Sequence, residues 1–186
     1  MIKLEHIYKA YGEKIIFHDF NLSLLDNKVY VLQGKNGIGK TTLLRILAGL
    51  EKYKGVIKGV NKVAMVFQED RLIDDQSVLI NLWLVLDKTF SEAKEIIEDV
   101  LKTFDLYHYK DQKISELSGG TRRKIAIIRA LLVPCNLLLL DEPLKGLDQS
   151  SQDLFTSYFL QEAQHKTVVW VSHADLTIKN MILINL

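Results

Sequence analysis

Gly34-Lys35-Asn36-Gly37-Ile38-Gly39-Lys40-Thr41 follows the apolar run Val29–Gln33 and leads into Lys40–Ala48, whose apolar residues have the spacing of a helix. A strand, a glycine-rich turn with the pattern G-x-x-x-x-G-K-T and a helix, in this order, are typical of a phosphate-binding loop. The glycines let backbone N–H groups point at phosphate oxygens, and the helix N-terminus adds the positive end of its dipole. The alternative is a glycine-rich turn that carries Lys-Thr by chance, which the strand and helix beside it disfavour.

This loop predicts the residues that would hold a nucleotide, so ATP and Mg²⁺ are the expected cofactors. Lys40 would reach the β- and γ-phosphates, and the Thr41 hydroxyl would bind Mg²⁺. The expected ATP-binding residues of the loop are Gly34, Asn36, Gly37, Gly39, Lys40, Thr41 and Thr42.

A second run, Leu137–Leu140, is wholly apolar and ends in Asp141 and Glu142. Such a run is typical of a strand in a parallel sheet that is covered on both faces. Because ligands bind outside the carboxyl ends of parallel strands, the acid pair should lie at the same edge as the glycine-rich loop. We expect Asp141 to hold Mg²⁺, and Glu142 to orient and deprotonate the attacking water as a catalytic residue beside Lys40. A strand followed by a solvated acidic turn is the alternative.

The rest of the chain alternates strands with helices, which favours an α/β fold with a P-loop NTPase core and a mostly parallel sheet. We expect one domain, with an antiparallel β portion near the N-terminus, a core over residues 1–69 and 133–186, and an inserted helical lobe over about 70–132. Further strands are expected at Ile2–Tyr8, Phe20–Leu25, Val56–Val60, Val63–Phe67, Thr167–Ser172 and Met181–Leu186, and further helices from a Ser91 cap to Phe104, at Thr121–Leu132 and at Asp153–Ala163.

Leu117-Ser118-Gly119-Gly120 stands before the helix expected at Thr121. Ser118 and the N–H groups of Gly119 and Gly120 would form a second anion site at a helix N-terminus, although one chain needs only one phosphate cradle. Here the chain resembles the ABC ATPase family, whose signature is Leu-Ser-Gly-Gly-Gln and whose motifs follow in the same order. In that family the signature of one protomer closes over the nucleotide held by the other, in a C₂ pair. A serine-capped helix after a flexible turn is the alternative.

The resemblance implies roles for four further residues. Tyr11 matches the aromatic residue that stacks on adenine, and Gln68 matches the glutamine that touches Mg²⁺ and senses the membrane partner. His173 matches the histidine that contacts the γ-phosphate, so it is expected among the catalytic residues, and Asp148 matches the loop aspartate that bridges protomers. Each residue also has an alternative without a role in ATP hydrolysis. Tyr11 could be a surface tyrosine, Gln68 a polar residue at a strand end, His173 a structural histidine, and Asp148 a solvated or helix-capping aspartate.

The chain departs from the family pattern at two places. Thr121 replaces the signature glutamine, so we expect function to survive with altered packing between protomers. Val66–Leu72 resembles the importer ATPases for nitrate, sulfonates, taurine and pyrimidine precursors, but Ile73-Asp74-Asp75 replaces their usual Leu-Pro-Trp. The apolar run Val78–Leu86 is expected either to dock a permease helix beside Gln68 or to fill the core of the lobe.

Bulk properties limit the classes of function. The 186 residues have a formal net charge of +1, which favours neither nucleic-acid nor anionic-membrane binding. The single cysteine, Cys135, cannot form an internal disulfide, which fits a reducing cytosol, and no segment reaches the length of a membrane-spanning helix.

The sequence therefore predicts the ATP-hydrolysing subunit of an ABC membrane transporter, in particular an importer, peripheral on the cytoplasmic face of the cell membrane. The expected partners are a second copy or a paired ABC ATPase subunit, an integral membrane permease and a solute-binding protein, but no nucleic acid. The rivals are a soluble ABC ATPase of DNA repair or ribosomes, and a nucleotide-binding module without turnover.

Overall fold

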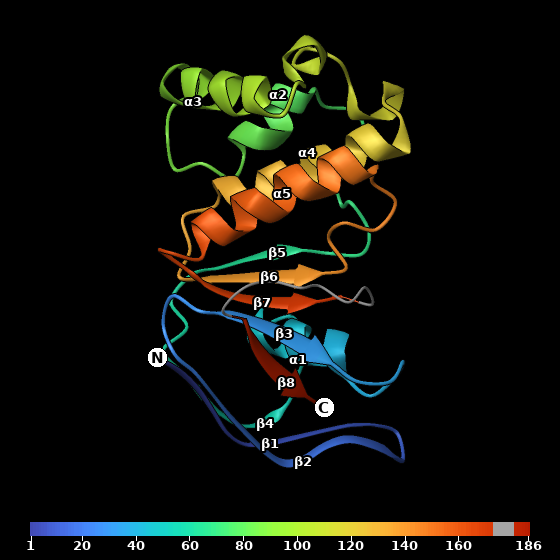
Figure 1. Cartoon of the computed structure of the whole chain (residues 1–186), viewed down its shortest axis with the longest axis vertical. Coiled ribbons are helices and arrows are strands. Elements are labelled where there is room, and N and C mark those ends of the chain that lie inside the picture. The colour runs from blue at the N-terminus through green and yellow to red at the C-terminus, as the bar shows by residue number, and fades with distance from the viewer. Residues whose placement is uncertain (173–180) are drawn as a thin grey trace.

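A five-stranded sheet is the centre of the computed structural model, which describes residues 1–172 and 181–186 (Figure 1). Its strand order is β5-β6-β7-β3-β8, and every neighbouring pair is parallel. The strands are β3 (Val29–Gln33), β5 (Val63–Val66), β6 (Leu137–Asp141), β7 (Thr167–Val171) and β8 (Ile182–Asn185). The expected α/β fold with a parallel core is thus confirmed.

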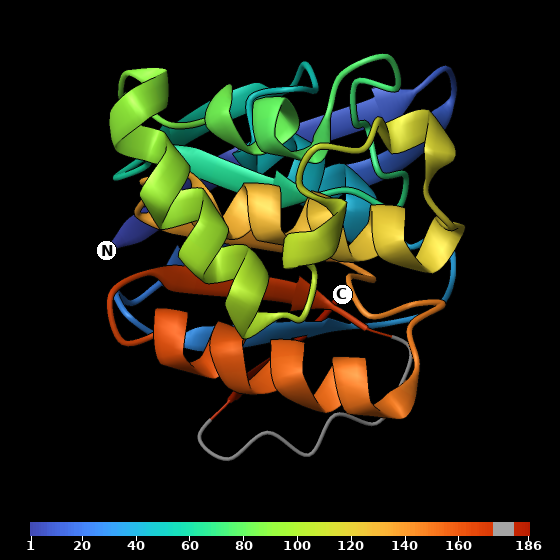
Figure 2. The same cartoon turned by 90° about the horizontal axis from the view of Figure 1, so that it is seen from above.

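The two faces of the parallel sheet belong to two apolar clusters. Along β6, Leu138 and Leu140 point into one cluster, whereas Leu137 and Leu139 point into the other. Helices α4 (Gly119–Leu132) and α5 (Gln149–Glu162) cover the first face, and α1 (Lys40–Leu47) covers the second (Figures 1 and 2). Because β6 is buried on both faces, its sequence is an unbroken apolar run.

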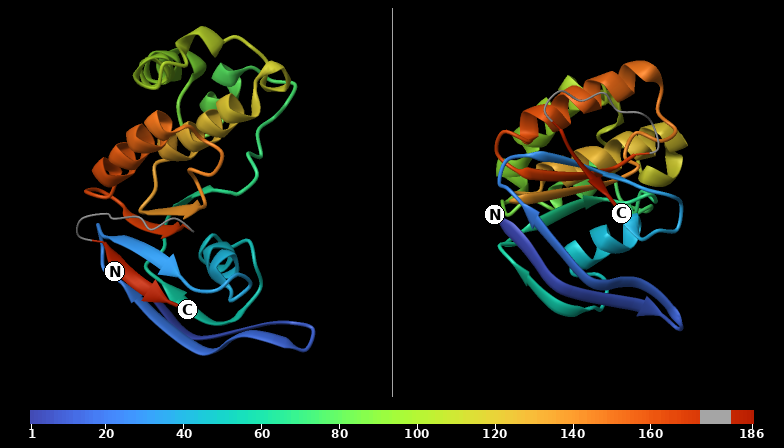
Figure 3. Two further views of the ribbon diagram at one scale, coloured as in Figure 1. Left: turned by 45° about the vertical axis from the view of Figure 1, so that its right-hand side comes forward. Right: turned by 60° about the horizontal axis from the view of Figure 1, so that its bottom comes forward.

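An antiparallel sheet of order β2-β1-β4 lies beyond α1, as expected for the N-terminal part of the chain (Figure 1). It consists of β1 (Ile2–Tyr11), β2 (Lys14–Leu24) and β4 (Lys54–Lys58), and the hairpin of β1 and β2 projects past the parallel sheet (Figure 3). The predicted start of β2 at Phe20 is wrong. Pairing of Tyr11 with Lys14 extends the hairpin, and the added part of β2 contains the unbroken apolar run 15–17, which shows no alternation of apolar and polar residues.

The helical lobe contains α2 (Val78–Trp83), α3 (Phe90–Thr103) and two short 3₁₀ helices, η1 (Tyr107–Tyr109) and η2 (Ile114–Glu116). It lies at the far end of the molecule from β1 and β2 (Figures 1 and 3). One apolar cluster continues from the parallel sheet through α4 into this lobe. The division into a core and a lobe at residues 69/70 and 132/133 stays a prediction.

Three helices begin earlier than the apolar pattern suggested, because polar caps set their first residues. Thr89, not Ser91, caps α3 and forms a capping box with Glu92. Asp148 caps α5, so that helix begins at Gln149 instead of Asp153, and Ser118 caps α4, which begins at Gly119 instead of Thr121. Within the described ranges, no helix combines the length and the apolar character needed to cross a membrane.

Candidate functional site

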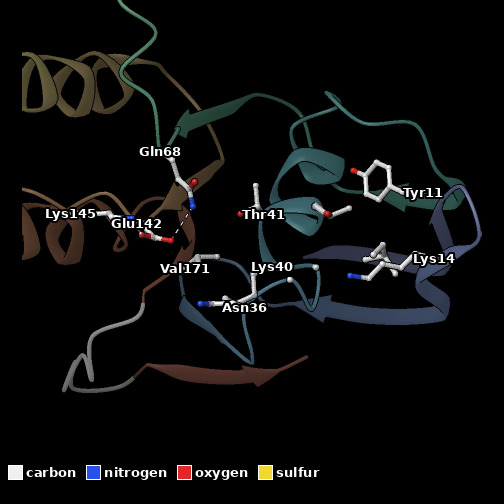
Figure 4. A pocket seen from close by; sticks show the side chains of 13 residues that line it. Tyr11, Lys14, Asn36, Lys40, Thr41, Gln68, Glu142, Lys145 and Val171 are labelled. Atoms are coloured by element: carbon white, nitrogen blue, oxygen red, sulfur yellow. Dashed lines mark hydrogen bonds and ion pairs between the residues drawn. The ribbon is translucent and has the colours of Figure 1, made fainter.

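A cavity of about 610 Å³ opens where β3, β5, β6 and β7 end (Figure 4). It brings together residues that the sequence singles out in four separate segments. Those that line it are Tyr11, Asn36, Gly37, Gly39, Lys40, Thr41, Thr42, Gln68 and Glu142. Residues on parallel strands meet here because all the strands end at the same edge.

The glycine-rich loop forms the floor of this cavity around Lys40. The buried Lys40 ammonium donates hydrogen bonds to the carbonyls of Gly34, at 2.7 Å, and Lys35, at 3.1 Å. Gly39, with φ 122°, precedes α1, and no side chain caps that helix. An uncapped N-terminus in a cavity, with a lysine held beside it, suits a phosphate group.

The acidic corner of the site is built from α1 and β6. The Thr41 hydroxyl donates to Asp141 Oδ1 at 3.3 Å, and Asp141 is only 2% exposed. Burial raises the pKa of the Asp141 carboxyl, and the hydrogen bond from Thr41 opposes that shift. A buried carboxylate beside a hydroxyl offers the oxygen ligands that Mg²⁺ prefers, so these residues fit the expected ion.

Glu142 is held from two sides at the edge of the same cavity. Gln68 Nε2 donates to its Oε1 at 3.0 Å (Figure 4), and Lys145 Nζ lies 3.1 Å from its Oε2. The backbone of Glu142 has φ 48°, a left-handed conformation that is uncommon for non-glycine residues. Lys145 also lines the cavity and was missed by the sequence reasoning, although a base placed three residues after Glu142 is a visible signal.

Tyr11 lies at the opposite end of the cavity from Glu142 (Figure 4). Tyr11 is 46% exposed, and the ammonium of Lys9 lies 4.3 Å from its ring centroid. Lys9 is itself buried and paired with Glu51 at 2.6 Å. The ring is therefore supported from within and remains accessible from the cavity, as an aromatic platform for a base requires.

The signature residues do not line this cavity. Ser118 caps α4 by accepting from the Thr121 N–H, and the Ser118 and Thr121 hydroxyl oxygens are 2.9 Å apart. Gly119 and Gly120 form the first turn of α4, and there is open space where their side chains would be. This helix end thus lies apart from the phosphate loop of its own chain.

Two other predicted site residues have different outcomes. Asp148 caps α5, and hydrogen bonds from Ser150 and Ser151 lower the pKa of its carboxyl. Lys124 Nζ lies 3.4 Å from Asp148, which joins this cap to α4. His173 lies outside the described residues.

The apolar run Val78–Leu86 mostly fills the core of the lobe. Val78, Leu79 and Leu82 are buried in one cluster with Ile97. Leu84 of the same run is 54% exposed, and the docking of a permease helix beside Gln68 and this run stays a prediction. Cys135 is partly buried, and burial raises the pKa of its thiol.

Comparisons with known proteins agree with this arrangement. Residues 17–145 match the family model described as ABC transporter. The Fe(3+) ions import ATP-binding protein FbpC 1 of Pectobacterium atrosepticum is 30% identical over 98% of this chain and 58% of its own length. The zinc import ATP-binding protein ZnuC of Rickettsia bellii is 32% identical over 96% of this chain and 78% of its own.

A third relative, the aliphatic sulfonates import ATP-binding protein SsuB 1 of Paraburkholderia xenovorans, is 38% identical over 79% of this chain and 44% of its own length. The chain thus spans only about half the length of several relatives that it matches. Among solved structures, a dimeric post-hydrolysis state of the ATP-binding cassette MJ0796 bound to ADP and Pi superposes with a TM-score of 0.83 at 26% identity, covering 94% of this chain and 88% of that one.

Proposed function

This chain belongs to the ABC transporter family, and on that premise we propose that it hydrolyses ATP to drive solute import through a separate permease. The observation that carries the proposal is the single cavity shared by Tyr11, the Lys40 loop, Gln68 and Glu142, with Asp141 beneath it. The relatives named above are import ATP-binding proteins, which supports the importer.

In the proposed reaction, Tyr11 stacks on the base while backbone N–H groups from Gly34 to Thr42 bind the phosphates. Lys40 exchanges its two carbonyl partners for β- and γ-phosphate oxygens. Mg²⁺, when bound, neutralises charge that develops on the phosphates, and Thr41, Gln68 and Asp141 would hold it. Glu142 would orient the attacking water and accept its proton. His173 is proposed to contact the γ-phosphate.

The lid of the site is proposed to come from a second ATP-binding subunit. Ser118, Gly119 and Gly120 form a helix N-terminus that does not line the cavity of their own chain. In a C₂ pair each chain would supply this end to the nucleotide of the other. Asp148 would lie near the interface between the two subunits, because its contact with Lys124 joins α5 to α4.

The core and the helical lobe would then move as two parts, with the lobe transmitting closure to the permease. We further propose a position peripheral to the membrane on its cytoplasmic side, and a solute-binding protein as a partner of the importer. Similarity to the sulfonate import protein supports a place for this chain among the importer ATPases for nitrate, sulfonates, taurine and pyrimidine precursors.

Release of phosphate from MgATP by the purified chain tests the proposed activity. Glu142→Gln should keep ATP binding and reduce turnover by about 10²–10⁴-fold, because the shape remains and the proton acceptor is lost. Lys40→Ala should instead weaken nucleotide binding. Near-normal turnover by Glu142→Gln would place the general base elsewhere, and recovery of a permease with the tagged chain would test the transporter assignment.

A further inference from the structure

Arg123, in the second turn of α4, is a buried arginine whose guanidinium binds backbone carbonyls of two different loops. Its Nη1 donates to the carbonyls of Phe67, at 2.5 Å, and Gln68, at 3.3 Å. Its Nη2 donates to the carbonyl of Glu142 at 2.8 Å, and its Nε to that of Pro143 at 2.9 Å. One side chain thus joins the loop after β5 to the loop after β6.

This arrangement uses a property of arginine that no other side chain has. The guanidinium is planar and carries five N–H donors, so it can satisfy several carbonyls in one plane at once. Asp70 is its acidic neighbour, but the distance from Nη1 to Oδ1 is 3.5 Å, longer than all four carbonyl contacts. Burial lowers the pKa of Arg123, and Asp70 opposes that shift. The donors are therefore directed mainly at the two loop backbones.

The carbonyls that Arg123 binds belong to the residues whose side chains meet in the site. Gln68 and Glu142 lie 74 positions apart, yet their side chains are joined by a 3.0 Å hydrogen bond. Arg123 donates hydrogen bonds to the backbone carbonyls of the same two residues. It also belongs to the helix that begins at Ser118, so a displacement of this helix end would reach both loops through one side chain.

We propose that Arg123 is a positioning residue that fixes Gln68 and Glu142 relative to each other and makes their placement depend on α4. The inference rests on the catalytic roles proposed for those two residues. When the Ser118 end of α4 is drawn toward a nucleotide, Arg123 adjusts the Gln68–Glu142 pair, so that water activation accompanies closure.

Arg129 provides a matched control on the same helix. Its Nη2 donates to the carbonyls of Arg71, at 2.8 Å, and Asp70, at 3.4 Å. Burial lowers its pKa as it does that of Arg123. None of the hydrogen bonds described for Arg129 involves Glu142. Loss of its guanidinium therefore removes a half-buried charge and its carbonyl contacts without releasing the acidic loop.

The first experiment compares ATP turnover of the full chain with that of Arg123→Met, Arg123→Lys and Arg129→Met. Displacement of a catalytic group by about 1 Å can reduce turnover by about 10²-fold, so Arg123→Met should lower kcat by about 10–100-fold while KM for ATP changes little. The kcat of Arg123→Lys should lie between those of Arg123→Met and the parent chain, because one ammonium cannot bind the carbonyls of both loops. Arg129→Met should keep a kcat near that of the parent chain.

A double-mutant cycle separates positioning from general destabilisation. If Arg123 acts through Gln68, then Gln68→Ala should lower kcat much less in the Arg123→Met background than in the parent chain. Additive losses would overturn the proposal, as would equal kcat values for Arg123→Met and Arg129→Met.

Hydrogen–deuterium exchange supplies a readout that does not need turnover. Arg123→Met should increase exchange in residues 67–70 and 142–145 together, whereas Arg129→Met should affect only residues 70–72. If Arg123→Met does not fold, Arg123→Lys is measured in its place. Absence of hydrolysis by the parent chain would contradict the proposed function and leave the exchange comparison valid. Unchanged exchange at residues 142–145 would overturn the role of Arg123.

Discussion

The N-termini of α1 and α4 are both candidates for binding phosphate, but the chain treats them differently. At α1 the preceding residue is Gly39, no side chain caps the helix, and Lys40 faces the cavity. At α4 the Ser118 side chain caps the helix, and its hydroxyl also contacts that of Thr121. An uncapped helix end leaves donors to be satisfied by a ligand, whereas a capped end is stable without one. This difference agrees with the proposal that the α1 end binds the nucleotide of its own chain and the α4 end meets the nucleotide of a second chain.

The glycines at the two helix ends show the same difference. A side chain at Gly39 would come within 2.7 Å of Ile16 Cγ2, and its φ of 122° disfavours any other residue. At Gly119 and Gly120 a side chain would meet nothing within 4 Å. The fold of this chain thus explains Gly39, whereas no contact among the described residues requires glycine at positions 119 and 120, in agreement with the partner proposed to approach this helix end.

The sharpest test of this comparison substitutes alanine at each end. Gly39→Ala should destabilise the chain by about 1–3 kcal/mol through backbone strain, and should strongly weaken ATP binding. Gly120→Ala should leave the melting temperature unchanged or higher, because alanine favours a helix by about 1 kcal/mol over glycine. It should nevertheless reduce hydrolysis that depends on pairing. Thermal melts and ATP titrations of both variants check this, and a large loss of stability in Gly120→Ala would remove the contrast.

Asp141→Asn tests whether the buried Asp141 carboxylate beside α1 destabilises the chain when Mg²⁺ and ATP are absent. Burial raises the pKa of Asp141, so its charge opposes folding of the nucleotide-free chain at neutral pH. The amide should raise the melting temperature by about 2–4 °C, which corresponds to about 1 kcal/mol in a chain of this size. It should also abolish the effect of Mg²⁺ on ATP binding. A lower melting temperature would show that the carboxylate stabilises the empty site.

The smallest expected effect concerns the contact between Ser118 and Thr121 at the α4 end. Thr121→Val keeps the shape of the side chain and removes the hydroxyl 2.9 Å from Ser118 Oγ. The serine can then donate to a phosphate of the partner's nucleotide, so ATP-dependent pairing should strengthen by about 2- to 10-fold, the effect of one hydrogen bond. Ser118→Ala in the same background should cancel the gain. Weaker pairing would mean that Thr121 supports the closed state.

The α1 end was largely predictable from sequence, whereas parts of the α4 end were not. Val29–Gln33, the glycine turn and Lys40 follow one another in the chain, so local spacing specifies them. The placement of the acid pair beside the glycine-rich loop followed from the rule that parallel strands end at one edge, whereas the hydrogen bond between Gln68 and Glu142 was not predicted. Arg123 was missed because its partners are backbone carbonyls, which have no sequence signal.

The starts of β2 and α5 were missed for related reasons. The first part of β2 contains three consecutive apolar residues, of which only Phe17 is buried, so it lacks the apolar alternation by which half-buried strands are recognised. The first turn of α5 contains Gln149, Ser150 and Ser151, so its position depends on the cap that Asp148 provides. Polar pairings of this kind are specified by local geometry, and the apolar pattern does not show them.

In the proposed arrangement, one chain holds a nucleotide and a second chain completes the site. Sedimentation of Glu142→Gln at saturating MgATP tests it most directly, because this variant should bind ATP without consuming it. We expect a monomer without nucleotide, and a dimer containing two ATP molecules when nucleotide is present. Sedimentation as a monomer at saturating ATP would contradict the claim that two of these chains suffice to complete the site.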